Sequence, residues 1–187
     1  MKIGVLDIQG SVEEHFNMLK KLKGVEPVLV KNAKDLEGVA GLIIPGGEST
    51  TIGKLLRKFG LRDEIIERVK KGLAIWGTCA GAILIAKKIV GKQSADSLEL
   101  MSITIERNAY GRQLDSFETK VKFEGKPVDA IFIRAPKIVK VGKGVKILAV
   151  CEGEIVAARE GKLLATNFHP ELTEDFSVHR YFQEMCR

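Results

Sequence analysis

The chain has few cysteines, few aromatic residues and no long hydrophobic run. Three of its 187 residues are cysteines, and aromatic residues make up 6%. Cys79, Cys151 and Cys186 form an odd, sparse set without paired spacing, which disfavours a disulfide framework or a zinc site. No apolar stretch approaches the roughly 20 residues that cross a bilayer, and the first residues lack a signal peptide's apolar core. We therefore expect a cytoplasmic protein that binds no metal and enters no membrane.

Signals for nucleic-acid and cofactor binding are also absent from the sequence. The formal net charge is +6, but the basic residues are dispersed among acids and form no basic run or nucleic-acid motif. Dispersed charge is typical of a solvated surface, so we expect no nucleic-acid partner and leave an acidic protein partner open. The chain has no phosphate-binding loop, dinucleotide fingerprint or metal-ligand cluster, so we expect no cofactor.

The chain length and the 45% hydrophobic content fit a single domain over residues 1–187. In the first half, apolar segments predict strands at 2–8, 26–30, 41–45 and 73–76. Helices are expected from Ser11, where residues 11–14 read as a capping box, and at 50–58, 61–71 and 82–88. Apolar strands alternating with helices predict an α/β fold with a mainly parallel sheet covered on both faces.

The second half has a different pattern, in which short strand-like segments follow one another. These lie at 100–106, 117–123, 128–133, 145–151, 154–160 and 162–167. We expect them to add antiparallel strands to the sheet. A last helix is expected from about Thr173, with an apolar face formed by Val178, Tyr181, Phe182 and Met185.

The most informative segment is residues 77–81, Gly-Thr-Cys-Ala-Gly, which lies between the predicted strand at 73–76 and the helix after it. A cysteine on a sharp strand-to-helix turn takes a strained backbone conformation, and side chains two residues to either side would clash. Gly77 and Gly81 occupy those two positions. The pattern predicts a nucleophile elbow that places Cys79 at a helix N-terminus and leaves the Ala80 N–H free for an oxyanion.

A cysteine nucleophile needs a base, and His169 is the best placed of the three histidines. It follows a predicted strand and precedes Pro170 and Glu171. In an extended chain, residues two apart point the same way, so we expect Glu171 to orient the imidazole of His169. His15 and His179 fall within predicted helices, where a lone histidine is more often structural.

The third element is a pair of glycines, Gly46 and Gly47, between the strand at 41–45 and the next helix. Such a pair can direct backbone N–H groups at a negatively charged oxygen, and the carboxyl end of a strand is where open α/β sheets place their sites. Double-glycine turns are also common without any function. The pattern by itself leaves both readings open.

Together these elements resemble the class I, or triad, glutamine amidotransferases, and within them the glutaminase subunits of pyridoxal 5′-phosphate synthase. The resemblance extends over nearly the whole chain and is carried by residues 4–10, 45–50, 77–81, 106–113, 116–118, 132–136 and 169–172. It implies a three-layer, flavodoxin-like fold with a mixed, mainly parallel sheet. The departures are small: Asp7 and Ser11 replace small apolar residues, and Tyr110 replaces phenylalanine.

The resemblance also implies a function for each element. Cys79, His169 and Glu171 would form the catalytic triad, and Gly47 and Ala80 would supply the oxyanion N–H groups. L-Glutamine would be bound by Gly46, Gly47, Glu48, Arg107, Ile133 and Arg134. The reaction would release glutamate and ammonia through a cysteine thioester.

The implied partner is a synthase subunit with a (β/α)₈ barrel in a large hetero-oligomer. It would use the ammonia with a pentose phosphate (ribose 5-phosphate) and a triose phosphate (glyceraldehyde 3-phosphate). Three alternatives stay open: a glutaminase subunit of another amidotransferase, a DJ-1/PfpI-like cysteine protein, or a catalytically silent subunit. The late histidine-proline-glutamate element argues against the second, and the complete set of Cys79, His169 and Glu171 argues against the third.

Overall fold

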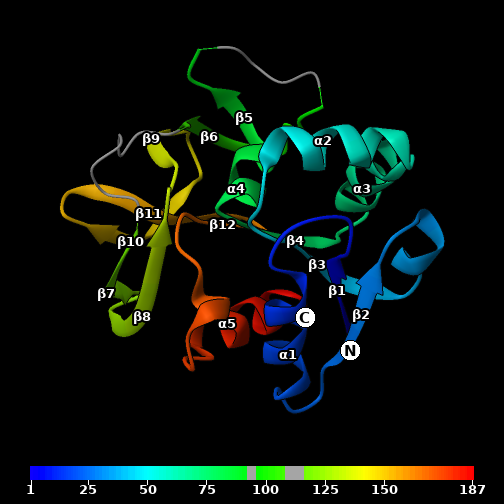
Figure 1. Ribbon diagram of the computed structural model, residues 1–187, viewed down its shortest axis with the longest axis horizontal. Helices are drawn as coiled ribbons and strands as arrows, with labels where there is room; N and C mark the ends of the chain where they lie inside the picture. Colours follow the sequence, from blue (N-terminus) through cyan, green and yellow to red (C-terminus); the bar gives the residue numbers. More distant parts are fainter. Residues whose placement is uncertain (92–95, 108–115) are drawn as a thin grey trace.

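The computed structural model describes residues 1–91, 96–107 and 116–187 (Figure 1). The strands are β1 (Lys2–Leu6), β2 (Glu26–Val30), β3 (Val39–Ile44), β4 (Ala74–Thr78), β5 (Ala86–Ile89), β6 (Met101–Glu106), β7 (Ser116–Phe123), β8 (Lys126–Ile133), β9 (Lys137–Val141), β10 (Lys146–Cys151), β11 (Glu154–Glu160) and β12 (Leu163–Thr166). The α-helices are α1 (Val12–Lys20), α2 (Ser49–Lys58), α3 (Leu61–Lys70), α4 (Ala80–Ile85) and α5 (Ser177–Met185). Two 3₁₀ helices are η1 (Ala33–Leu36) and η2 (Pro170–Leu172). Residues 108–113 of the family-like stretch at 106–113, with Tyr110, lie outside the described residues.

The main sheet has the strand order β2-β1-β3-β4-β12-β11-β9-β6-β5, with β10 paired to β11. Strands β1 to β4 run parallel to their neighbours, and β12 joins them parallel to β4. Strand β11 is antiparallel to β12, β10 and β9. The predicted α/β fold, a parallel sheet extended by antiparallel strands from the second half, is confirmed.

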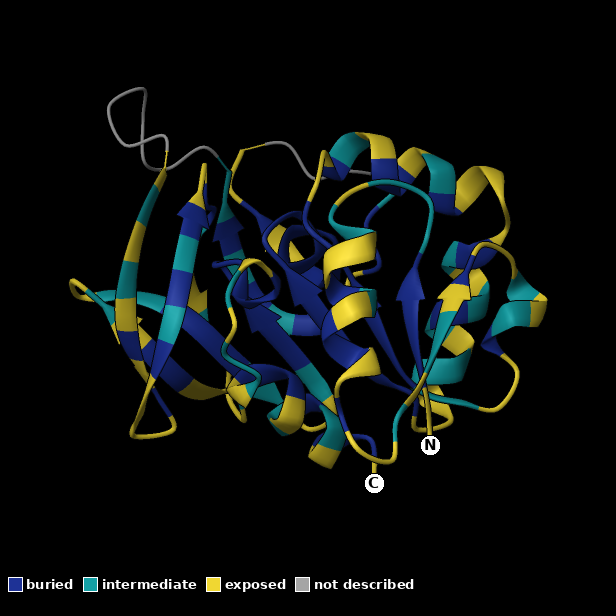
Figure 2. Cartoon of the chain, turned by 60° about the horizontal axis from the view of Figure 1, so that its bottom comes forward, coloured by how far each residue is buried: buried dark blue, intermediate teal, exposed yellow. Residues whose placement is uncertain are grey.

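Helices cover both faces of this sheet, which makes three layers (Figure 1). Successive side chains of a strand point to opposite faces, so each central strand contributes to two cores. Leu42 and Ile44 of β3 pack in one core with Ile52 of α2. Ile43 packs in the other core with Leu19 of α1. Figure 2 shows the central strands buried between helices whose outer faces are exposed.

Two predictions about the secondary structure and its pairing were wrong. Strands β7 and β8 form a separate two-stranded sheet, so they do not extend the main one. The helix predicted at 82–88 ends at Ile85, and Lys87 and Lys88 lie in β5. Strands β5 and β9 were not predicted, because two lysines in each interrupt the apolar pattern. Pairing of both strands with β6 stabilises them.

Helices α1 and α5 also differ from the prediction at their N-termini. Ser11 is the N-cap of α1 but makes no side-chain capping hydrogen bond, so the predicted capping box does not form. The last helix begins at Ser177 and not near Thr173, because the Thr173 and Asp175 side chains accept backbone N–H groups and form turns before it. Among the described helices, none is long and apolar enough to span a membrane.

Candidate active site

Cys79 lies on the turn between β4 and α4, as predicted. Its backbone angles are φ 48° and ψ −104°, a conformation that non-glycine residues rarely adopt. A Cβ on Gly81 would lie 2.0 Å from the Ile44 carbonyl oxygen, and one on Gly77 would lie 2.5 Å from the Gly81 backbone. Both positions therefore require glycine for the steric reason that the sequence indicated. The turn holds Cys79 at the carboxyl end of the sheet.

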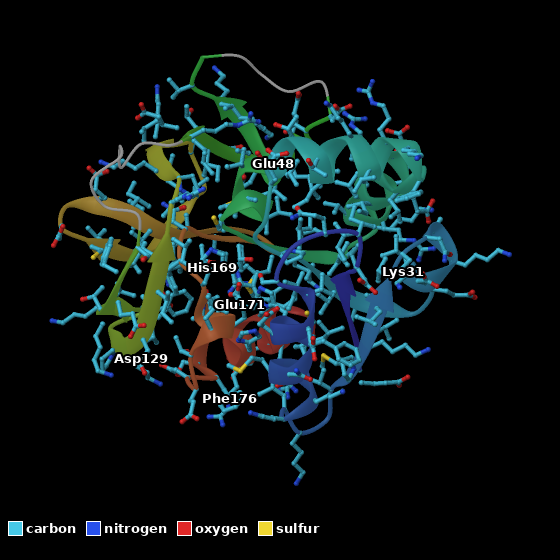
Figure 3. All side chains as sticks on the ribbon, in the orientation of Figure 1. Lys31, Glu48, Asp129, His169, Glu171 and Phe176 are labelled. Carbon is cyan, nitrogen blue, oxygen red and sulfur yellow. The ribbon has the colours of Figure 1, made fainter. Side chains whose placement is uncertain are left out.

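His169 and Glu171 contact each other directly, with 2.7 Å between His169 Nδ1 and Glu171 Oε1. Both side chains are buried, and Figure 3 shows them together near the centre of the molecule. The predicted contact is confirmed, but the extended-chain reason for it was wrong. Glu171 lies in the 3₁₀ helix η2, whose tight turn brings its side chain back to His169 at the helix start.

The charge state of His169 depends on two partners. Burial alone would lower the pKa of His169, but hydrogen bonds with Cys79 and Glu171, and the negative charge of both, raise it to about 10. Because Nδ1 of His169 contacts Glu171, Nε2 is the ring nitrogen that can interact with Cys79. The geometry therefore favours an imidazolium between a sulfur and a carboxylate, the arrangement that activates a cysteine nucleophile.

Glu171 is surrounded by three polar side chains. Burial would raise the pKa of its carboxyl, but interactions with His15, His169 and Ser11 lower it to about 2. The Ser11 hydroxyl donates to Oε1 at 2.7 Å, and His15 Nε2 lies 3.4 Å from Oε2. Burial lowers the pKa of His15, so near neutral pH its ring is uncharged, and the hydrogen bonds from His169 and Ser11 then help to keep Glu171 ionised.

The Gly46-Gly47 loop packs against Cys79 and His169. A Cβ on Gly46 would lie 2.4 Å from His169 Cε1, so only glycine allows this approach. The Gly46 carbonyl accepts the Ser11 N–H at 3.1 Å, and the Gln9 side-chain oxygen accepts the Glu48 N–H at 2.9 Å. The segment after β1 therefore holds the loop in place from the other side.

Glu48 lies at the rim of the site and caps α2 (Figure 3). Its carboxylate accepts the Thr50 and Thr51 N–H groups at 2.9 and 2.6 Å, and also the Thr51 hydroxyl at 2.6 Å. The Thr51 hydroxyl is the largest contribution that lowers the pKa of Glu48 to about 2. Glu48 is thus a fixed negative charge beside the loop.

A cavity of about 570 Å³ joins these elements. The predicted residues that line it are Gly46, Gly47, Glu48, Cys79, Ala80, Arg107, Ile133, Arg134 and His169. Glu171 lies behind His169 and does not line the cavity, and the Ile133 carbonyl oxygen is 4.0 Å from Cys79 Sγ. Arg107 Nε and Nη2 are buried without a hydrogen-bond partner among the described residues. The cavity therefore combines a sulfur, an imidazole and a guanidinium with two nitrogens that have no partner among the described residues.

Sequence reasoning missed the residues behind the triad. Ser11 was read as a helix cap, and His15 and His179 were read as structural, yet Ser11 and His15 contact Glu171 and His179 contacts His15. The spacing of Ser11 and His15 could have indicated this, because residues four apart share one face of a helix.

In the described ranges, no group of three or more His, Cys, Asp or Glu side chains could hold a metal ion.

An α/β sheet with a cysteine elbow, a histidine-glutamate pair and a glycine loop at its carboxyl edge defines the class of triad amidotransferases. The family comparison gives the same class. The model of the SNO glutamine amidotransferase family matches residues 5–187, and the chain belongs to this family. A DJ-1/PfpI-like protein is therefore no longer an alternative.

Several relatives are similar over their whole length. A protein of Niallia circulans named pyridoxal 5′-phosphate synthase subunit PdxT is 53% identical over 100% of this chain and 98% of its own. A Thermotoga neapolitana protein of the same name is 50% identical over 100% of both chains. A crystal structure described as a glutamine amidotransferase is 49% identical, with a TM-score of 0.94 over 98% of both chains. A chain in the structure of PurLQS from Thermotoga maritima, 16% identical with a TM-score of 0.72 over 100% of this chain and 99% of its own, shares the fold.

Proposed function

We propose that this chain hydrolyses L-glutamine to L-glutamate and ammonia, and that the ammonia is used in the synthesis of pyridoxal 5′-phosphate. The observation that carries this proposal is the contact of His169 with Glu171 at a cavity that Cys79 and His169 line together with the Gly46-Gly47 loop. Full-length relatives at 50–53% identity that are named as subunits of this synthase support the second part. We retain a single domain over residues 1–187 as a prediction.

The proposed reaction begins with attack of the Cys79 sulfur on the side-chain amide carbon of glutamine. The N–H groups of Ala80 and Gly47 would stabilise the negative oxygen of the tetrahedral intermediate. His169 would give its proton to the leaving nitrogen, so that the C–N bond breaks and ammonia departs from a γ-glutamyl thioester.

Hydrolysis of the thioester would complete the cycle. His169, now neutral, would take a proton from water, and the resulting hydroxide would attack the thioester carbon. The C–S bond then breaks, which releases glutamate and restores the Cys79 sulfur, with one water consumed overall. Glu171 would stay ionised throughout and stabilise the imidazolium form of His169.

Substrate recognition would depend on opposite charges at the cavity wall. The Nε and Nη2 groups of Arg107, buried without a partner among the described residues, need an acceptor, and the α-carboxylate of glutamine would supply one with two oxygens. Arg134 and the Ile133 backbone, at the rim of the cavity, would help to hold the same carboxylate. The fixed negative charge of Glu48 would favour the α-amino group. Such a site selects an amino acid over a simple amide.

A partner subunit would take up the ammonia, which is largely protonated and unreactive once it reaches neutral water. We propose a synthase subunit with a (β/α)₈ barrel, in a large hetero-oligomer, that uses ribose 5-phosphate and glyceraldehyde 3-phosphate. Ile133 and Leu172 line the cavity yet are 38% and 40% exposed, which supports a protein surface that covers its mouth. A cytoplasmic location and the absence of a cofactor remain predictions.

The experiment that tests this proposal is glutamate release from glutamine by the purified chain, alone and with a pyridoxal phosphate synthase subunit. Release should rise with the partner and vanish in Cys79→Ala. A folded chain that releases no glutamate even with the partner would overturn the proposed function. Release that the partner leaves unchanged would instead indicate a glutaminase serving another amidotransferase.

A further inference from the structure

The carboxylate of Glu171 is contacted by two residues of the first helical turn as well as by His169. We propose that Ser11 and His15 are positioning residues, which hold this carboxylate in the orientation that His169 requires. The inference rests on the proposed roles of Cys79, His169 and Glu171. It adds residues that the resemblance to triad amidotransferases did not indicate.

Each oxygen of Glu171 faces a different residue of this turn. Ser11 is the N-cap of α1 and His15 lies four residues later, so both side chains leave the same face of the helix. The Ser11 hydroxyl donates to Oε1 at 2.7 Å, the same oxygen that His169 Nδ1 contacts at 2.7 Å. His15 Nε2 lies 3.4 Å from Oε2. Rotation of the carboxylate away from His169 would break both contacts.

The direction of the hydrogen bonds follows from the charge on Glu171. His15 Nε2 is hydrogen-bonded to Thr78 Oγ1 at 3.2 Å and lies 3.4 Å from Glu171 Oε2, which has no hydrogen-bond partner among the described residues. Because an ionised carboxylate only accepts, a bare Nε2 would put two lone pairs opposite each other, so we assign the hydrogen to Nε2. His15 Nδ1 is then an acceptor, and His179 Nε2 donates to it across 3.0 Å. His179 Nδ1 is buried without a partner in the described part of the chain. In this tautomer it carries no hydrogen, so no N–H group is buried without an acceptor.

His15 and His179 are both neutral, so His15 can stabilise the carboxylate of Glu171 without neutralising its charge. Burial is the largest influence on both and lowers their pKa, against the negative charge of Glu171 and, for His15, of Glu14. A charged His15 would compete with His169 for the same carboxylate. A neutral N–H dipole 3.4 Å from Oε2 instead stabilises the negative charge and leaves it available to the imidazolium of His169.

Ser11 also joins this carboxylate to the glycine loop. Its hydroxyl contacts Glu171 while its backbone N–H donates to the Gly46 carbonyl at 3.1 Å. This explains why the hydroxyl does not cap α1. One residue thus connects the acid of the proposed triad with the loop that would face the substrate oxygen.

The test uses three variants and a matched control, assayed with the partner subunit. Ser11→Ala removes the hydroxyl that donates to Oε1, and His15→Leu removes the imidazole beside Oε2. His15→Gln keeps an N–H near the position of Nε2. Ser177→Ala changes an exposed serine at the start of α5, and its kcat should match the unmodified chain.

We expect kcat to fall about fivefold in Ser11→Ala and about thirtyfold in His15→Leu, with KM changed less than about twofold. His15→Gln should recover most of the lost kcat. A second readout is the titration of His169 by NMR in a Cys79→Ala background, which needs no activity. The pKa of His169 should fall by about half a unit to one unit in Ser11→Ala and His15→Leu, because Glu171 moves away from the ring.

An unchanged His169 titration in Ser11→Ala and in His15→Leu would overturn the positioning role, whatever happens to kcat. If His15→Leu fails to fold, the His169 titration in Ser11→Ala decides the question. If the unmodified chain itself releases no glutamate, the proposed function fails, while the NMR titration continues to test whether these residues hold Glu171.

Discussion

Replacement of Glu171 by glutamine would isolate the effect of its negative charge on His169. The two side chains have nearly the same shape, so Glu171→Gln keeps the packing around η2 and removes the charge. The glutamine oxygen can still accept from His169 Nδ1, which now lies 2.7 Å from the carboxylate. What is lost is the charge-assisted part of that hydrogen bond.

The size of the effect can be worked out from this contact. A hydrogen bond to a charged group contributes about 1.5–3 kcal/mol, and one pKa unit corresponds to about 1.36 kcal/mol. The pKa of His169, now raised to about 10, should therefore fall by about 1–2 units. If the stabilisation acts fully on the transition state, glutamate release should slow by about 10- to 100-fold at neutral pH.

The assay is glutamate release across a pH series, with His169 titrated by NMR in the Cys79→Ala background. Glu174→Gln is the matched control, because Glu174 is an exposed glutamate three residues further along the chain. Thermal unfolding should show that both variants fold. A Glu171→Gln enzyme whose rate and His169 titration both match the control would refute the proposed electrostatic role of Glu171.

The elbow, the substrate site and the triad acid each give a further prediction. Gly81→Ala should lower the melting temperature and abolish glutamate release, because its Cβ would lie 2.0 Å from the Ile44 carbonyl oxygen, and calorimetry would measure this. Arg107→Lys should raise KM for glutamine about tenfold with little change in kcat, since a lysine cannot bind the α-carboxylate through two N–H groups; a smaller kcat with unchanged KM would contradict this. Burial would raise the pKa of Glu171, but its partners lower it from 4.5 to about 2, so its ionised form favours the folded state. That stabilisation is fully present above pH 4.5 and is lost as the pH falls through about 2, and urea unfolding should show a smaller loss over this range in Glu171→Gln.

The elements that the sequence predicted well are those with a strong local pattern. Strands β2 and β11 begin and end where they were expected, and Gly60 separates α2 from α3 in a left-handed conformation. The elbow around Cys79 was also predictable, because the clash that requires Gly77 and Gly81 acts over only a few residues. Local steric clashes and hydrophobic periodicity depend on residues that are close together in the chain, so they can be predicted from a single sequence.

The elements that were missed depend on partners far away in the chain. Strands β5 and β9 have weak patterns of their own and are stabilised by pairing with β6. Strands β7 and β8 look like sheet strands, but their place outside the main sheet depends on the packing of the whole domain. A strand's sequence reports its buried face and not the neighbour that it pairs with.

The sequence by itself determined which residues could carry chemistry: a cysteine on a glycine-flanked turn, a histidine two residues before a glutamate, and a glycine pair at the end of a strand. Only the tertiary structure decided how Glu171 is held. Ser11 and His15 are 160 and 156 residues away from it in the chain, and no local pattern reports a hydrogen bond across that separation. The sheet brings the ends of β1 and β12 to the same edge, and that spatial arrangement turns a helix cap and an apparently structural histidine into neighbours of the active-site acid.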